Sequence, residues 1–196
     1  MILALDTCLA ACSVALRLGA DTIARTEIIG TGHAERVAPM LAALLAEAGA
    51  AARDLTCLCV TVGPGSFMGT RVGLSLAKGL ALPRRVPCVP ITTLHAIGLS
   101  APGAPVLIDA RRGQAYALPP GPGRGGTPAL VSHDEARALA LAGRPVGVGL
   151  GAIGLRGPDS FPDVRLMLDH AADAEPAPLR PFYLRAPDAK PGRPSL

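Results

Sequence analysis

Short apolar and β-branched runs open the chain and predict three strands, over residues 2–6, 11–18 and 22–29. The Gly19-Ala20-Asp21 turn joins the second strand to the third as a hairpin. A helix is expected over residues 33–48, since apolar side chains recur there at intervals of three and four positions. These positions are Val37, Met40, Leu41, Leu44, Leu45 and Ala48.

The central stretch from Cys57 to Leu82 predicts a buried strand, a tight turn and a buried helix. The strand covers residues 57–62, the turn residues 63–69 and the helix residues 70–82, with Ser66 and Thr70 as candidate caps. The turn has three glycines, but no lysine follows Gly69, so it does not fit the phosphate-binding P-loop pattern. We therefore expect its glycines to allow close packing or the approach of a partner.

The same order of elements then repeats. A strand at 86–91 and a helix at 94–99, capped by Thr92 or Thr93, complete the first set. Strands at 105–109, 114–118 and 129–131, a helix from the Ser132 capping box to about residue 142, and a strand at 146–150 form the second.

The repeat predicts an α/β protein of two βββαβα-type lobes, residues 1–100 and 101–196, with the second lobe shortened. The first strand of each lobe ends in an aspartate, Asp6 or Asp109. The connection 119–128 and the tail from residue 175 are rich in proline, and we expect neither to pack in a core.

Composition narrows the function classes. Aromatic residues make up 3% of the chain and tryptophan is absent, which disfavours base-stacking platforms for single-stranded nucleic acid. The net charge of +4 is uneven, being −2 over residues 1–50 and +4 over residues 51–100. No run of Lys or Arg exceeds two, so a solvated surface explains the charge better than a nucleic-acid patch.

The start of the chain predicts a cytoplasmic protein without a membrane segment, since MILALDT lacks the basic region of a signal peptide. Five cysteines, an odd number, favour reduced thiols over a disulfide framework. A zinc site at Cys8, Cys12, Cys57 and Cys59 is a weaker alternative, because this spacing is unusual for zinc.

Two carboxylates ending equivalent strands are typical of actin-like ATPases, in which they hold the metal of a nucleotide bound between the lobes. Asp6 and Asp109 are the candidates, and Thr7 could donate to a phosphate, although the turn after Asp6 has no glycine. His33 would need a second histidine one turn later to hold a metal, but that position is Val37. We therefore predict no catalytic residue and no metal site.

The helix over residues 33–48 also suggests a partner surface. Small residues fill its reverse face, at Ala34, Ala38, Ala42, Ala43 and Ala46. Because small residues let a second helix approach closely, we expect a partner chain to bury this face. Alanine-rich sequence without any partner remains the alternative.

Several motifs together resemble the TsaB family of bacterial tRNA threonylcarbamoyladenosine biosynthesis proteins. They are ILALDT, ACSVAL, HAERVAPML, VTVGPGSFMGTRVGLSLAKGLAL, IDARRGQAY and FYLRAPDA, in that order. The resemblance implies an actin-like ATPase (ribonuclease H-like) fold without activity of its own. Met68 departs from the family, which usually has threonine there.

The resemblance also implies partners. Such proteins pair with the catalytic paralogue TsaD, which carries the paired histidines, and the ATPase TsaE joins them. The assembly transfers threonylcarbamoyl from threonylcarbamoyl-AMP to the adenosine beside the anticodon of tRNAs reading ANN codons. Alone, such a chain is expected to form a homodimer, to meet ATP only at a partner interface and to reach tRNA through the complex.

The resemblance places partner contacts on the helix that starts at His33. The implied contact residues are His33, Val37, Ala38, Leu41, Ala42 and Leu45. Two other functions stay open from the residues alone. One is an autonomous actin-like ATPase or kinase that uses Asp6, Thr7 and Asp109, and the other is a metalloprotease of the glycoprotease family.

Overall fold

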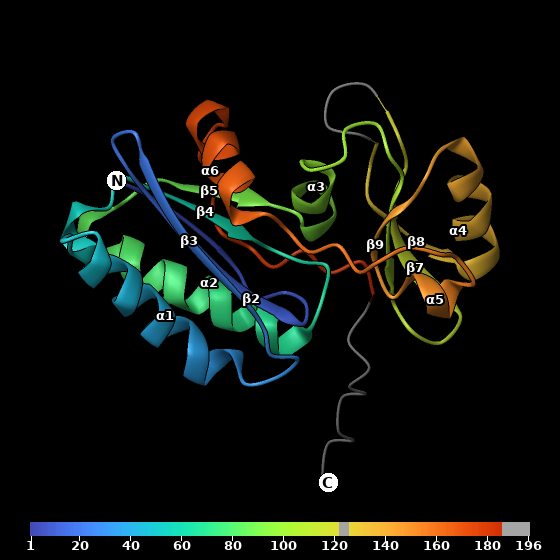
Figure 1. The fold of residues 1–196 in the computed structure, drawn as a ribbon, viewed down its shortest axis with the longest axis horizontal. Helices are drawn as coiled ribbons and strands as arrows, with labels where there is room; N and C mark the ends of the chain where they lie inside the picture. The colour runs from blue at the N-terminus through green and yellow to red at the C-terminus, as the bar shows by residue number, and fades with distance from the viewer. Residues whose placement is uncertain (122–125, 186–196) are drawn as a thin grey trace, which may run out of the picture.

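Two mixed β-sheets form the framework of the molecule (Figure 1). The computed structural model describes residues 1–121 and 126–185. The first sheet has the order β3-β2-β1-β4-β5 and the second the order β8-β7-β6-β9. In each sheet the first strand in sequence is antiparallel to the next one and parallel to a later one on its other side. The predicted α/β fold with a repeated βββαβ unit is thus confirmed.

The elements follow the predicted order with small shifts. The first sheet is built from β1 (Ile2–Asp6), β2 (Ala11–Leu18), β3 (Asp21–Ile28), β4 (Cys57–Thr61) and β5 (Cys88–Ile91). Its helices are α1 (His33–Glu47), α2 (Phe67–Ala81) and α6 (Val164–Asp173). The second sheet comprises β6 (Val106–Asp109), β7 (Gln114–Leu118), β8 (Ala129–Ser132) and β9 (Val146–Val148). It packs with α3 (Thr93–Gly98), α4 (His133–Leu139) and α5 (Leu150–Ile153).

Local hydrogen bonds explain where the helices begin. The hydroxyl of Ser66 accepts a bond from the N–H of Gly69 at 3.2 Å, so α2 starts at Phe67, three residues before the predicted start. Thr70, the other predicted cap, lies inside the helix, and that prediction is wrong. Thr92 caps α3, as predicted. The predicted strand 146–150 ends early because Gly149, at a φ of 73°, turns the chain into α5.

Two helices side by side, α1 and α2, cover one face of the first sheet, and α6 crosses its other face (Figure 1). The first face buries Leu3, Leu5 and Leu58 of the strands against apolar side chains of both helices. These helical side chains are Val37, Met40, Leu41, Leu44, Leu74 and Ala77. This cluster has more buried apolar residues than any other in the described part of the chain, so we expect it to contribute strongly to stability.

The helix α6 has no counterpart in the elements predicted from the sequence. Its buried apolar residues lie at Val164, Met167, Leu168 and Ala171, one stripe of an amphipathic helix. They pack on Ala4 and other small residues of the first sheet. The sequence predicts a lobe boundary after residue 100. The helix α6 comes after that boundary, yet it covers the first sheet.

The prediction that the tail packs in no core is wrong for its described part. Leu179 is buried in the core beneath α2, and Phe182 packs on the same cluster. The N–H of Ala177 donates to the carbonyl of Cys88 at 2.8 Å, and that of Phe182 to the carbonyl of Val62 at 2.7 Å. The tail beyond residue 185 and part of the connection 119–128 lie outside the described residues.

None of the helices within residues 1–121 and 126–185 combines the length and apolar character needed to cross a bilayer.

Candidate functional site

The carboxylate of Asp6 is completely buried at the end of β1. Its Oδ1 accepts hydrogen bonds from the hydroxyl of Thr61 at 2.6 Å and from the N–H of Cys8 at 3.1 Å. Its Oδ2 has no hydrogen-bond partner among the described residues. Burial raises the pKa of Asp6, since loss of solvent outweighs the opposing effects of Thr61, Cys8 and the nearby His33.

The glycine turn after β4 lies directly on the turn after β1. The hydroxyl of Thr7 donates to the carbonyl of Gly69 at 2.7 Å, and the N–H of Ser66 donates to the carbonyl of Cys8 at 2.7 Å. A Cβ on Gly65 would lie 2.2 Å from the Cys8 oxygen, and one on Gly69 only 2.0 Å from the Thr7 oxygen. The glycines thus permit close backbone packing, one of the two roles expected from the sequence.

The fold family implies a bound nucleotide. The packing of the glycine turn on the turn after β1 determines whether the residues around Asp6 could hold one. A phosphate needs exposed donors, but the hydroxyl of Thr7 already donates to the carbonyl of Gly69, and Thr7 is only 1% exposed. A metal needs an accessible carboxylate, and Asp6 has no exposed surface. Asp6 and Thr7 therefore do not fit a nucleotide or its metal in this arrangement.

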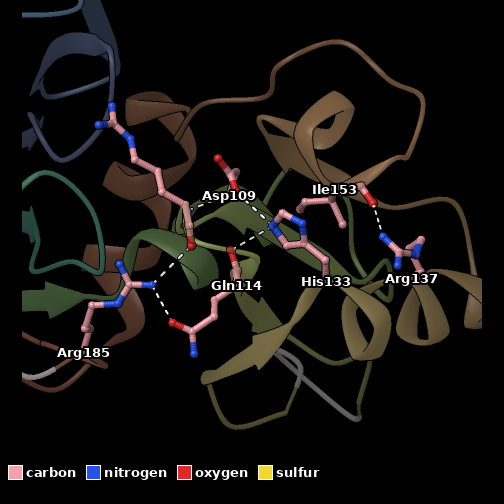
Figure 2. A network of polar contacts seen from close by, with 7 residues as sticks. Asp109, Gln114, His133, Arg137, Ile153 and Arg185 are labelled. Atoms are coloured by element: carbon pink, nitrogen blue, oxygen red, sulfur yellow. Dashed lines mark hydrogen bonds and ion pairs between the residues drawn. The ribbon is translucent and has the colours of Figure 1, made fainter.

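The second aspartate, Asp109, ends β6 and is held by the second lobe (Figure 2). Nε2 of His133 lies 3.1 Å from its Oδ1 and also 3.1 Å from the carbonyl of Gln114. The N–H of Arg111 donates to the same Oδ1 at 3.1 Å. Arg185 extends the network from the tail and donates to the side chain of Gln114 at 2.7 Å. The carboxylate thereby fastens the turn after β6 to the start of α4.

The structure shows where the candidate ligands of the two hypothetical metal sites lie, one at His33 and one at the cysteines. Within residues 1–121 and 126–185, no three His, Cys, Asp or Glu side chains gather closely enough to hold a metal ion. His33 starts α1 with its Nε2 3.2 Å from the carbonyl of Ala11, and Val37 is buried in the core. Neither the protease hypothesis at His33 nor the zinc alternative at the cysteines finds a ligand set there.

The predicted partner-binding residues divide into two groups. His33, Val37 and Leu41 are 7%, 2% and 4% exposed, and the latter two belong to the core of the same chain. Ala38 and Ala42 are exposed and Leu45 is half-buried. Because the side chains of Val37 and Leu41 are buried within the chain, the small residues open to a partner on α1 are those of its exposed alanine face.

A cluster of exposed side chains was not foreseen from the sequence. Phe67 and Arg71 at the start of α2 meet Tyr183 of the tail. The chain has only five Phe and Tyr residues, so two of them side by side at the surface is a departure from the usual burial of rings. The FYLR motif is visible in the sequence, but no local pattern indicates that its tyrosine contacts α2.

Comparison with known proteins places these features in a family. Residues 25–121 match the family model described as TsaD: tRNA N6-adenosine threonylcarbamoyltransferase. The chain is 38% identical over 121 residues to the tRNA threonylcarbamoyladenosine biosynthesis protein TsaB of Escherichia coli, a match covering 59% of this chain and 52% of the relative. TsaB of Bacillus subtilis is 36% identical over 125 residues, with coverage of 59% and 52%. The match thus spans about half the length of these two relatives.

Other relatives match over nearly the whole chain. An uncharacterized protein of Mycobacterium tuberculosis H37Rv is 33% identical over 201 residues, covering 97% of this chain and 94% of the relative. The solved structure of YeaZ from Pseudomonas aeruginosa has a TM-score of 0.72 and 25% identity, with coverage of 87% of this chain and 90% of that one. A second structure, described as similar to peptidase YEAZ and also from P. aeruginosa, has a TM-score of 0.75 and 27% identity, with coverage of 91% and 99%. The chain therefore belongs to the TsaB (YeaZ) family.

Proposed function

We propose that this chain is a non-catalytic subunit in tRNA threonylcarbamoyladenosine biosynthesis, the process named for its TsaB relatives. It supports the transfer of threonylcarbamoyl from threonylcarbamoyl-AMP to the adenosine beside the anticodon of tRNAs that read ANN codons. Membership of the TsaB family indicates the process. The complete burial of Asp6 is the observation that supports a non-catalytic role.

A non-catalytic role follows from the inaccessibility of Asp6. A nucleophile, a base or a metal ligand must reach a substrate, and Asp6 is 0% exposed beneath the glycine turn. Opening this region would break the hydrogen bonds from Thr7 to Gly69 and from Ser66 to Cys8. We infer that catalysis takes place in a TsaD-like partner and that Asp6 serves the fold.

The partner surface follows from exposure. Ala34, Ala38 and Ala42 lie on one exposed stripe of α1, where a helix of a TsaD-like subunit could approach closely. The same stripe would support a homodimer when the partner is absent. A TsaE-like ATPase would join the assembly, ATP would bind at a partner interface, and tRNA would be reached through the complex in the cytoplasm.

The proposal is tested by depleting the protein and measuring threonylcarbamoyladenosine in bulk tRNA by mass spectrometry. We expect the modified nucleoside to fall, and to be restored by the wild-type chain and also by Asp6→Asn. Unchanged modification after depletion would refute the role in this process. Failure of a folded Asp6→Asn variant to restore it would refute the non-catalytic part.

The two other functions make different predictions for the isolated chain. An autonomous ATPase or kinase would show steady ATP turnover that Asp6→Asn abolishes. A metalloprotease would carry a stoichiometric metal ion lost in a His33→Ala variant. No contact among the described residues favours either function over the proposed one.

A further inference from the structure

Three side chains form a compact exposed group where the start of α2 meets the tail. The rings of Phe67 and Tyr183 stack with centroids 5.8 Å apart and planes inclined by 26°. The guanidinium carbon of Arg71 lies 3.8 Å from the centre of the Phe67 ring, and its Nε donates to the hydroxyl of Tyr183 at 3.4 Å. Phe67 and Tyr183 are 47% and 42% exposed. We call these three residues the aromatic-arginine cluster.

The cluster is held in place from both sides. Phe67 and Arg71 lie one turn apart on α2, and the N–H of Phe182 donates to the carbonyl of Val62 at 2.7 Å just before Tyr183. A Cβ on Gly63 would lie 2.7 Å from the carbonyl oxygen of Phe182, so the tail touches the glycine turn directly. Side chains fixed before binding lose less conformational entropy when a partner arrives.

Arg71 presents its charge in a defined direction. Only its Nε has a hydrogen-bond partner among the described residues, which leaves both terminal nitrogens as a planar fork. No acidic residue lies in the first turn of α2, so the positive end of the helix adds to this charge. Such a fork fits a carboxylate or a phosphate in a bidentate manner.

The surroundings favour a protein carboxylate over an RNA phosphate. Met68 is 66% exposed beside the cluster, and aromatic residues, Met and Arg are the types enriched at the centres of protein interfaces. Binding to an RNA backbone needs several cations that follow the phosphates, whereas here a single fork stands among apolar side chains. The single guanidinium and the apolar residues around it therefore favour a protein partner that carries a carboxylate over an RNA.

Resting on the proposed function, we infer that the aromatic-arginine cluster anchors the transferase-type partner subunit, which places an Asp or Glu side chain on Arg71. An apolar side chain beside that carboxylate would contact Phe67 and Met68. On the side of α2 toward α1, Met68 and Val72 line a hollow of about 390 Å³ with residues 30–35. Ala34 also lines this hollow, so the anchor adjoins the alanine face of α1, while Arg71 itself contacts Phe67 and the tail.

The test uses the full chain and the TsaD-like transferase of the same organism, with the dissociation constant measured by calorimetry at two salt concentrations. We expect Arg71→Ala to weaken association by roughly tenfold to a hundredfold, the range of a buried charged contact. Arg71→Lys should lose nearly as much, because it keeps the charge but not the fork. Tyr183→Phe should lose less, and Arg165→Ala, exposed on α6, should bind as the wild type does.

The outcomes separate the hypotheses. A folded Arg71→Ala variant that binds the transferase as tightly as the wild type overturns this inference and leaves the proposed function intact. A wild-type chain that does not bind the transferase overturns both. Unchanged subunit affinity with weaker tRNA binding by the assembled complex overturns the inference in favour of a phosphate contact.

Discussion

The hydroxyl of Thr7 and the carbonyl of Gly69 are joined by a buried hydrogen bond of 2.7 Å, although the residues lie 62 positions apart. The bond ties the turn after the central strand of the first sheet to the first turn of α2. It also uses the one hydroxyl of the turn that a phosphate would need. The same contact therefore stabilises the fold and removes a binding group.

The close approach at Gly69 predicts a large loss of stability on adding a methyl group. Gly69→Ala places a Cβ 2.0 Å from the carbonyl oxygen of Thr7, so backbone must move, and we expect a loss of about 1–3 kcal/mol or more. The matched control is Gly79→Ala in the same helix, where nothing lies within 4 Å of the added atom. It should gain about 0.5–1 kcal/mol. Urea unfolding of both variants checks the prediction, and a shift in the same direction for both would contradict it.

Burial of Asp6 predicts a pH dependence of stability. Its pKa is raised above the ordinary value of 3.8, so between these values the native chain holds a proton that the unfolded chain has lost. Stability should therefore fall as pH rises from about 4 toward the native pKa and then level off. Asp6→Asn should lack this fall, while the exposed Asp173→Asn should keep it. Urea midpoints between pH 4 and 8 measure the difference, and parallel curves for wild type and Asp6→Asn would disprove the assignment.

Docking of α6 on the first sheet predicts that its buried face is essential for stability. Leu168 is 0% exposed within the cluster formed with the sheet. Leu168→Ala should lower the free energy of unfolding by about 2–5 kcal/mol, the usual cost of a cavity in a core. Arg165→Ala on the exposed side of the same helix should change it by less than about 0.5 kcal/mol. Equal stability of the two variants would show that α6 does not dock.

Exposure along α1 predicts that neighbouring substitutions have different effects. Ala42→Glu leaves the fold unchanged but buries an unpaired charge when a partner helix approaches, so association should weaken by on the order of a hundredfold or more. Leu41 is 4% exposed in the core, and Leu41→Glu should unfold the chain. The control is Ala172→Glu on the exposed side of α6. Size-exclusion chromatography with and without the TsaD-like protein decides, and an unchanged profile for Ala42→Glu would assign that face to solvent.

Most helices and strands could be predicted because the features that specify them lie within the segment itself. The strand at Cys57–Thr61 follows from a β-branched run, and the start of α4 from the Ser132 capping box, whose reciprocal hydrogen bonds are present. The repeated order of elements along the chain was also recognisable, and each βββαβ unit lies in its own sheet. These features depend on neighbours within a few residues along the chain.

The candidate site depended on contacts between distant segments. Sequence alone named Asp6 and Thr7 but could not show that the turn at Gly65 and Gly69 would cover them. It assigned Val37 and Leu41 both to the core and to a partner, and only the packing of α1 on the sheet separates these roles. In α6 the helical spacing from Val164 to Ala171 is present, but prolines on both sides disguised it. The sheet it covers lies more than seventy residues earlier in the chain.

The return of α6 and the tail to the first sheet has a consequence for synthesis. When the ribosome has released residues 1–91, all five strands of that sheet exist, but the face toward α6 and the site of Leu179 are still bare. Apolar surface of this kind is prone to aggregation while it waits for its cover. We therefore expect the first lobe to complete its folding only after residues 164–182 have emerged and covered this face.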